Sequence, residues 1–562
     1  GGGDGDGGSD GDSSGGGGGR DSLATSLAFL DDLDVTQWLV DHHIQTVRRP
    51  PKAFVDQYRT VMIQTAMWAN SSDPVLKNRG TKLLMLGSAL TLYPPARGGR
   101  KNHKAEWQVR FNHFARREFT ALMELAKQAC AGFKPRRRYD DRARNFAAEV
   151  VRASQEGEED TLSPFTSRKV EFQARLGNLR KAASLLQAPA LLDLTQPVLE
   201  QLRNKHPSRP DGPLPDFPGR PAGDPSPEER DLMDEVGKQY GQAITTASKG
   251  SAPGISGWRY EHFQCLLEPS TGPRPVDDGM QHIYAFFDRI LIGDLEDWCR
   301  DLLRFGKGFA LAKPDGGVRP ITVTDTFRRL VTRAVAFKYR TTWCSFLGPN
   351  QFAVGTKAGS EKLVHCVSAF INSVEEGTCS ALLLDCVNAF NACDRKVILD
   401  ALHGAYPELE PFFKQFYGGR SPILYRGADG SPHYIWSEEG TMQGDPAGPF
   451  LFCLGLKACL DAIEAQLPAS AIILSLMDDI TVLLDSESAL EAFKICQREL
   501  KSKFNLELNV MKSKVVPFGD TPAGPQFPEA TLDEMRVCRL EGLEIARRSG
   551  AKLLGCPIGT DA

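Results

Sequence analysis

The sequence lacks both the cysteine spacing of a metal-binding module and the long apolar run of a membrane span. Its 13 cysteines include no C-x-x-C pair and its 10 histidines form no H-x3–5-H pattern, so neither a zinc finger nor a disulfide framework is indicated. Reduced thiols in an intracellular protein are the simplest interpretation. No run of about 18 apolar residues occurs, so we expect no membrane-spanning segment.

The beginning of the chain lacks apolar residues altogether. Residues 1–19 read GGGDGDGGSDGDSSGGGGG, and residues 1–20 are therefore predicted to be a disordered Gly/Asp-rich segment with nothing to bury. The same composition excludes a signal peptide at this end. Because the first residue is Gly rather than Met, we expect a fragment that begins within a longer protein.

The net charge of −4 hides an uneven distribution of charge. Residues 97–144 hold fourteen Lys or Arg against five Asp or Glu, and this basic patch lies in a region, residues 21–205, that is predicted to be a helical N-terminal extension. Its apolar residues recur at helical spacing, as in Phe111, Phe114, Phe119, Leu122 and Leu125. Residues 206–229 are rich in Pro and Gly and are predicted to be a linker.

Beyond this linker, predicted strands and helices alternate, which favours an α+β fold around a sheet. Residues 308–323, GFALAKPDGGVRPITV, predict two strands joined at Asp315-Gly316-Gly317. Residues 359–376 predict a helix with Ser360 as its N-cap. A short buried strand is predicted to end at Asp385, followed by a helix from about Asn391.

Two adjacent carboxylates, Asp478 and Asp479, interrupt the apolar run AIILSLMDDITVLLD. Taken alone, such a pair is most often a turn in a hairpin. If the strand that ends at Asp385 lies beside this hairpin, three carboxylates converge, which is unfavourable unless cations fill the site. Oxygen ligands of this kind suit Mg²⁺, and two such ions can activate a 3′-hydroxyl and stabilise a departing pyrophosphate.

Further residues fit around such a site, although each has a structural alternative. Lys313 and Arg319 flank the predicted turn, where a basic hairpin could close over a triphosphate or be an ordinary solvated hairpin. Phe390 could pack beneath a sugar and exclude a 2′-hydroxyl, or belong to the core. Gln443 could hydrogen-bond a base or a strand, and Gly444 allows close backbone approach to a ligand.

Seven motifs in one order resemble those of reverse transcriptases, specifically those of non-LTR (LINE-like) retrotransposons. The resemblance covers roughly residue 246 to the C-terminus, and the collinear order of the motifs is specific although each motif is weak. The motifs are SAPGISGWRYEHF (251–263), KPDGGVRPI (313–321), LLLDCVNAFNACDR (382–395), QGDPAGPFLF (443–452), LMDDI (476–480), LNVMKSKVV (508–516) and AKLLGCPIG (551–559).

The resemblance implies roles for individual residues and two Mg²⁺ ions as cofactors. The implied metal ligands are Asp385, Asp478, Asp479 and the carbonyl of Cys386. Lys313 and Arg319 correspond to residues that hold the triphosphate, Phe390 to the gate that favours deoxyribonucleotides, and Gln443 and Gly444 to the motif lining the nucleotide. Lys512 corresponds to the lysine that protonates pyrophosphate, with Lys514 as an alternative.

The family fold implied is a right-handed polymerase with fingers at residues 230–345 and a palm at residues 346–562. The sequence ends just past the motif that resembles a primer grip, so we expect the thumb to be missing from a C-terminally truncated fragment. No endonuclease or zinc-finger module is found. Leu476 stands where the family usually has an aromatic residue, two positions before the Asp pair.

The resemblance predicts an RNA-directed DNA polymerase whose partners are template RNA, a DNA primer and dNTPs. It implies action in the nucleus at the time of integration if the element is active, and it leaves the protein partners unknown. The basic patch, interleaved with aromatic residues, is a candidate template surface, or a solvated helix with buried aromatics. The alternative functions are an RNA-dependent RNA polymerase and an inactive or domesticated nucleic-acid-binding remnant.

Overall fold

The computed structural model describes most of the chain, in two compact units. Described are residues 18–42, 45–95, 103–131, 170–171, 174, 191–268, 279–313, 316–374, 379–518, 544–545, 550–554 and 556–559. The first unit comprises residues 1–133, 249–251 and 256–286, and the second comprises residues 134–248, 252–255 and 287–562. The predicted domain boundaries stay predictions, and most of the predicted disordered segment lies outside the described residues.

The described elements of the first unit are helices and short 3-10 turns. They are α1 (Gly18–Leu27), α2 (Val35–His42), α3 (Val55–Ala69), α4 (Pro74–Thr91), α5 (His103–Ala115), α6 (Phe119–Ala131), α13 (Tyr260–Leu266) and the start of α14 (Met280–Ile292), with short 3-10 turns at Ala28–Leu30 and Lys52–Phe54.

The aromatic residues of the basic patch lie in the core of this unit. Trp107, Phe111, Phe114 and Phe119 are each at most 4% exposed. Arg110 is also buried, with its guanidinium 3.6 Å from the ring centre of Tyr93. Since these rings pack inward, the alternative of a solvated helix with buried aromatics is correct for the described residues 103–131, and the rings cannot stack on nucleic acid.

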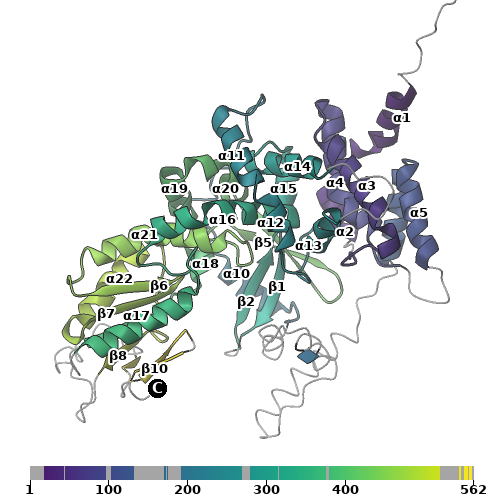
Figure 1. Ribbon diagram of the computed structural model, residues 1–562. Coiled ribbons are helices and arrows are strands. Elements are labelled where there is room, and N and C mark those ends of the chain that lie inside the picture. Colours follow the sequence, from purple (N-terminus) through teal and green to yellow (C-terminus); the bar gives the residue numbers. More distant parts are fainter. Residues whose placement is uncertain are drawn as a thin grey trace, which may run out of the picture. The chain divides into compact units, whose positions relative to one another are not determined.

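The described part of the second unit combines helices with three sheets, and this mixed α/β architecture agrees with the predicted alternation (Figure 1). A four-stranded sheet has the order β2 (Val318–Val323), β1 (Gly306–Ala312), β4 (Ser421–Arg426), β5 (Pro432–Ser437). A five-stranded sheet has the order β6 (Ile472–Leu476), β7 (Asp479–Asp485), β3 (Cys379–Leu384), β8 (Lys514–Phe518), β9 (Glu544–Ile545), and β10 (Gly550–Leu553) pairs with β11 (Cys556–Gly559).

The helices of this unit surround the sheets. They are α10 (Gln196–Lys205), α11 (Pro227–Gly237), α12 (Tyr240–Thr245), α15 (Asp297–Arg304), α16 (Thr326–Leu347), α17 (Gly359–Ser373), α18 (Ala389–Ala392), α19 (Arg395–Ala405), α20 (Glu410–Tyr417), α21 (Gly448–Glu464) and α22 (Ala489–Phe504), with 3-10 turns at Pro407–Leu409 and Ser486–Ser488.

The five-stranded sheet is covered on both faces. Leu363 and Val367 of α17 pack with Ala381, Leu474 and Leu483 of the strands on one face. Helices α21 and α22 contact the strands β6 and β3, and Figure 1 shows them on the side of the sheet away from α17. Because residues in a strand alternate between faces, this double cover explains why β3 and β7 read as nearly continuous apolar runs.

The four-stranded sheet has one face packed against α10. Leu199 and Leu202 of that helix join Ala310, Ile423 and Ile435 in a buried cluster. The strand residues between these positions point to the other face, because side chains alternate along a strand.

Two local predictions near helix starts are wrong. The N-cap of α17 is Ala358, with φ 55° and no side-chain hydrogen bond, so Ser360 lies inside the helix instead of capping it. The helix predicted from Asn391 begins instead at Arg395, because the Asp394 side chain accepts a hydrogen bond from the Lys396 amide at 2.8 Å and caps the helix there. Asn391 belongs to the preceding short helix, α18.

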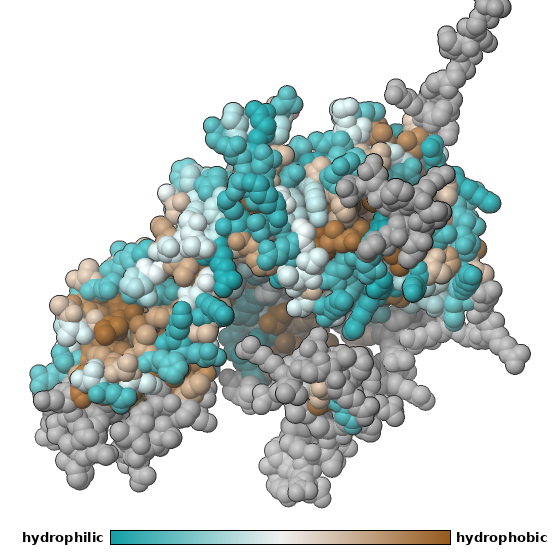
Figure 2. Space-filling view, viewed as in Figure 1, coloured by the Kyte–Doolittle hydropathy of each residue, from teal (hydrophilic) through white to brown (hydrophobic). Residues whose placement is uncertain are grey.

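Hydrophilic and hydrophobic residues are mixed over the surface seen in Figure 2. Among the helices that the structure describes, none is long and apolar enough to cross a membrane.

Candidate active site

The β6–β7 hairpin places the two adjacent aspartates at its tip. Leu476 pairs with Asp479 as the last pair of the ladder, which leaves Met477 and Asp478 as the two residues of the turn. Met477 has φ 61°, in the left-handed region that suits the reversal of a tight hairpin but costs energy for a residue with a side chain. Asp478 therefore lies in the turn itself, and Asp479 is the first residue of β7.

The end of β3 brings the third aspartate to the same place. Leu384 pairs with Ile480 of β7, so the next position along the antiparallel register sets Asp385 opposite Asp479 on one face of the sheet. The backbone of Asp385 is held on its other edge. Its N–H donates to Ser513 Oγ at 3.2 Å, and its carbonyl accepts from the Asn509 amide at 2.7 Å.

Burial and neighbouring charges raise the pKa values of Asp478 and Asp479. Burial raises the pKa of Asp478 to about 6, and the charges of Asp479 and Asp385 add to this rise. Partial loss of hydration, followed by the charge of Asp385, raises the pKa of Asp479. Burial first, and then the charge of Asp478, also raises the pKa of the Cys386 thiol beside them. The predicted convergence of the three aspartates is thus seen in the structure.

The carboxylates are close, but they do not form a closed metal cage. Among the described residues, no group of three His, Cys, Asp or Glu has the arrangement of a metal-binding cluster. The donor chemistry nevertheless fits cations, because hard oxygen ligands that repel one another are stabilised by bound positive charge. The backbones of Asp385 and Val387 form hydrogen bonds with residues 507–509 on one side of the chain. Because backbone carbonyls alternate in direction along an extended chain, the Cys386 carbonyl is directed to the opposite side, where β7 lies.

Phe390 is half-buried and has a fixed position. Its ring stacks on that of Phe452 in α21, with centroids 4.6 Å apart and planes inclined by 21°. Its carbonyl accepts a hydrogen bond from the Thr441 amide at 2.6 Å. The Phe390 ring is thus neither fully buried in the core nor free to move. The hydrogen bond to Thr441 also connects Phe390 to the segment that precedes Gln443.

Gln443 and Gly444 lie against β2. The Gln443 carbonyl accepts a hydrogen bond from the Thr322 amide at 2.8 Å. Gly444 has φ 116°, and a Cβ at this position would lie 2.3 Å from the Thr322 carbonyl oxygen. The close approach that requires glycine is therefore to the backbone of β2, whereas the sequence prediction assigned it to a ligand. Gln443 Oε1 is buried without a hydrogen-bond partner among the described residues.

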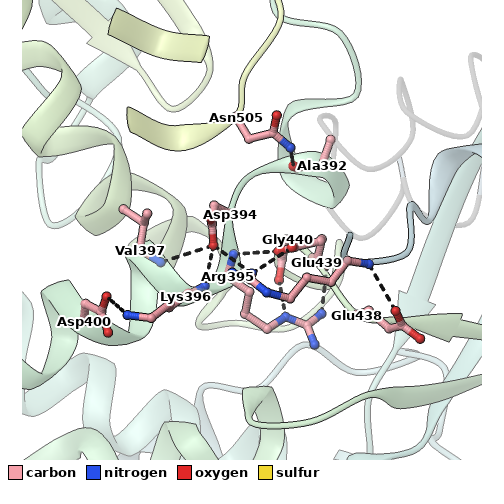
Figure 3. Close-up of polar contacts among 11 residues, drawn as sticks. Ala392, Asp394, Arg395, Lys396, Val397, Asp400, Glu438, Glu439, Gly440 and Asn505 are labelled. Atoms are coloured by element: carbon pink, nitrogen blue, oxygen red, sulfur yellow. Dashed lines mark hydrogen bonds and ion pairs between the residues drawn. The ribbon is translucent and has the colours of Figure 1, made fainter. Parts of the chain in front are cut away.

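Besides β2, buried charged residues hold the loop that contains Gln443 and Gly444. The guanidinium of the buried Arg395 donates to the carbonyls of Gly440 at 3.0 Å and Glu439 at 2.8 Å, and to Ser437 Oγ at 2.7 Å. Glu439 in turn accepts from the Arg395 amide at 2.8 Å and from Arg209 at 2.8 Å. Figure 3 shows the Arg395 side chain extending to Glu439 and Gly440. This cluster fixes the chain three residues before Gln443.

Asp445 anchors the loop after Gly444. Its carboxylate forms an ion pair with Arg328 and accepts from the Tyr417 hydroxyl at 2.9 Å and the Ala447 amide at 3.1 Å. The side chains of Asp445 and Arg328 are both 1% exposed. A buried carboxylate with this many partners is held rigidly, so Asp445 is a structural part of the loop.

The predicted basic residues occupy more open positions. Arg319 is an exposed residue of β2, opposite Leu311. The Lys313 amide donates to the Gly317 carbonyl at 2.8 Å, while Asp315 of the predicted turn lies outside the described residues. Lys512 is exposed in a turn, and Lys514 begins β8 opposite Leu383, on the sheet face that carries Asp385. The assignment between the two lysines stays a prediction.

Comparison with known proteins agrees with this arrangement. Residues 311–558 match the family described as reverse transcriptase (RNA-dependent DNA polymerase). Over this range the chain is similar to reverse transcriptases. The matched range contains every site residue predicted above, from Lys313 to Lys512.

The chain also resembles one curated protein. It is 28% identical over 316 residues to the retrotransposable element SLACS 132 kDa protein of Trypanosoma brucei gambiense. The match covers 55% of this chain and 25% of the relative, so the chain spans only about a quarter of that protein's length. Together the two matches confirm the predicted resemblance to a non-LTR retrotransposon reverse transcriptase.

Two features of the site were not predicted. Arg395 ends the motif LLLDCVNAFNACDR, and a basic residue after an aspartate gave no sign of burial. Gln351 lies in a loop, where it hydrogen-bonds the β6–β7 turn at Met477. An isolated Gln carries no sequence pattern, and both roles depend on partners far away in the chain.

Proposed function

We propose that the chain is an RNA-directed DNA polymerase that extends a primer 3′-end with dNTPs, using two Mg²⁺ ions. The observation that carries this proposal is the position of Asp385, Asp478 and Asp479 at adjacent strand ends, as the register of β3, β6 and β7 sets them. The similarity of residues 311–558 to reverse transcriptases supports the same reaction. In the terms of the family, the five-stranded sheet would be the palm, and the β1–β2 hairpin would belong to the fingers.

The metal ions would be held by Asp385, Asp478, Asp479 and the Cys386 carbonyl. Bound Mg²⁺ supplies activation of the primer hydroxyl and charge stabilisation of the leaving pyrophosphate. Asp385 and Asp479 face each other across the register, so they can share ligands between them, while the turn sets Asp478 at the open end. Lys512, or alternatively Lys514, would give a proton to the leaving pyrophosphate.

The nucleotide would lie between the hairpin and the Gln443 loop. Lys313 and Arg319 would bind the triphosphate oxygens, because both cations belong to the exposed side of the β1–β2 hairpin. Phe390 cannot retreat easily, since its ring rests on Phe452, and it would exclude a 2′-hydroxyl by contact. Gln443 and Gly444 would line the nucleotide from the side of β2.

The outer face of the four-stranded sheet is the surface that best fits template RNA. The strands β1, β2, β4 and β5, all described, contain no acidic residue. Trp436 and Tyr434 are 42% and 40% exposed, and the Arg420 guanidinium lies 4.2 Å from the centre of the Trp436 ring. Exposed aromatic rings beside cations bind single-stranded nucleic acid by stacking and phosphate contact.

Primer extension with the full chain tests the proposal. An RNA template annealed to a DNA primer, with Mg²⁺ and either dNTPs or NTPs, should give extension with dNTPs at least about tenfold faster than with NTPs. Faster extension with NTPs would indicate an RNA-dependent RNA polymerase instead. RNA binding without extension by either set would indicate a binding remnant.

A further inference from the structure

We propose that Gln351 is a positioning residue that fixes the turn bearing Asp478. The inference rests on the proposed polymerase function for its chemical consequence, but the tether itself is a structural claim that can be tested separately. Gln351 belongs to the loop after α16, more than a hundred residues before the hairpin that it contacts. The residue is buried, with 5% of its surface exposed.

The backbone around Gln351 runs alongside β6. Gln351 and Ser475 form an isolated parallel bridge, with the Phe352 amide donating to the Ser475 carbonyl at 2.8 Å. The Ser475 amide and hydroxyl both donate to the Asn350 carbonyl, at 2.7 Å and 3.0 Å. These bonds set the loop at a fixed distance from the end of the strand, immediately before the turn.

The side-chain amide of Gln351 reaches past the end of the ladder. Its Oε1 accepts from the Met477 amide at 2.9 Å and from the Ala353 amide at 3.0 Å. Its Nε2 donates to Ser475 Oγ at 3.0 Å. Both lone pairs of the oxygen are therefore used, and the amide links its own loop, the last part of β6 and the turn.

The turn needs such a tether for two reasons. Met477 is in the left-handed region with φ 61°, a conformation that persists only when its surroundings hold it. The residue that follows is Asp478, which is repelled by Asp479 and Asp385. Because the last ladder pair is Leu476 with Asp479, the bond from Met477 to Gln351 restrains the turn beyond the end of the ladder.

A positioning role has a defined chemical consequence. Catalytic groups must be held within about 0.5 Å of their productive geometry, and removing a partner that orients a metal ligand typically lowers metal affinity or activity by about 10–100-fold. Gln351 does not touch the reacting atoms, so its loss should lower kcat and raise the Mg²⁺ concentration for half-maximal rate, with the KM for dNTP changed less than about twofold.

The experiment compares Gln351→Ala with Gln415→Ala in the full chain. Gln415 is a matched control, because it is also buried and donates to the Ile290 carbonyl at 2.7 Å but lies in α20, away from the turn. Hydrogen exchange followed by mass spectrometry measures the peptide that contains residues 473–480. Primer extension then gives kcat, the KM for dNTP and the Mg²⁺ dependence.

In Gln351→Ala we expect amide exchange in that peptide to rise about tenfold, corresponding to loss of one hydrogen bond, and kcat to fall about 10–100-fold. Gln415→Ala should change neither. Equal exchange of this peptide in the two variants would overturn the tether, whether or not the wild type polymerises. Faster exchange with an unchanged kcat and Mg²⁺ dependence would overturn the positioning role. A wild type without incorporation but with the expected exchange difference would refute the polymerase function and leave the tether supported.

Discussion

Substitution of Gly444 by alanine probes how the nucleotide loop is held against β2. A Cβ at Gly444 would lie 2.3 Å from the Thr322 carbonyl oxygen, and the backbone there has φ 116°. Contacts of real Cβ atoms essentially never fall below 3.0 Å, so the loop and the strand must move apart. The backbone conformation alone is unfavourable for a residue with a side chain.

The size of the effect follows from these two terms. An unfavourable φ of this kind costs about 1–3 kcal/mol, and loss of the hydrogen bond from Thr322 to Gln443 costs about 1 kcal/mol. Gly444→Ala should therefore lower the free energy of unfolding of the second unit by about 2–4 kcal/mol. It should also raise the KM for dNTP, because Gln443 shifts together with the loop.

Gly404→Ala is the control for this prediction. Gly404 is in helix α19, and a Cβ there would meet no atom within 4 Å. An added methyl group in a helix should stabilise the protein by about 0.5–1 kcal/mol. Urea unfolding of both variants, with primer extension, measures the difference. A Gly444→Ala protein as stable as wild type, with an unchanged KM, would refute the reasoning about close approach.

Three further predictions concern the gate, the template face and acid stability. Phe390→Val should reduce the preference for dNTPs over NTPs by about 10–100-fold, measured as the ratio of kcat/KM values; an unchanged ratio would remove Phe390 from the gate. Trp436→Ala should weaken binding of single-stranded RNA about tenfold in a filter-binding assay. Phe346 is also exposed, but Phe346→Ala should leave RNA binding unchanged. Equal losses of affinity in the two variants would count against the template face. His262 is buried, and burial lowers its pKa to about 3, so stability should fall by about 1.4 kcal/mol per pH unit as the pH drops below 6.5. Urea unfolding at pH 7 and pH 5 checks this, and a His262→Gln protein with the same pH dependence would exclude the histidine as its source.

The pH prediction has a direct structural cause. His262 Nε2 lies 2.8 Å from the Val47 carbonyl and must carry a proton to donate to it, while Nδ1 accepts from the Arg259 amide at 3.1 Å. If Nδ1 also carried a proton, that proton would point at the N–H of Arg259, which is itself a donor. The folded state therefore keeps the neutral ring, and below pH 6.5 the unfolded chain gains a proton that the folded chain does not bind.

The carboxylate site could be predicted because its signals are local. Asp385 ends an apolar strand, and Asp478 and Asp479 interrupt another apolar run, so alternation and strand ends were enough to suggest that they meet. Ser360 and Asn391 show the limit of local reasoning, since a cap depends on the backbone conformation that the chain adopts next to it. Asp394, which the structure uses as the cap, is equally suitable by residue type.

The residues that hold the site in place could not be predicted from local sequence patterns. Arg395, Arg209 and Gln351 act through partners that are distant in the chain, and a single polar residue gives no periodic signal. The burial of Trp107 and Phe111 was one of two open alternatives, because an aromatic stripe on a basic helix can face a core or a ligand. Gly444 was singled out for close approach to a ligand, whereas its close neighbour in the structure is the backbone of β2.

Single-nucleotide incorporation by Asp478→Asn, compared with Asp485→Asn, tests the central claim most directly. Asp485 ends the same strand, where it accepts a hydrogen bond from Ser470 Oγ at 3.2 Å, far along β7 from the turn. With an RNA template, a DNA primer, dNTP and Mg²⁺, we expect Asp485→Asn to retain wild-type incorporation. Asp478→Asn should bind the template–primer normally and lose incorporation by at least about a thousandfold. Substantial incorporation by Asp478→Asn would contradict catalysis by metal ions held at these carboxylates.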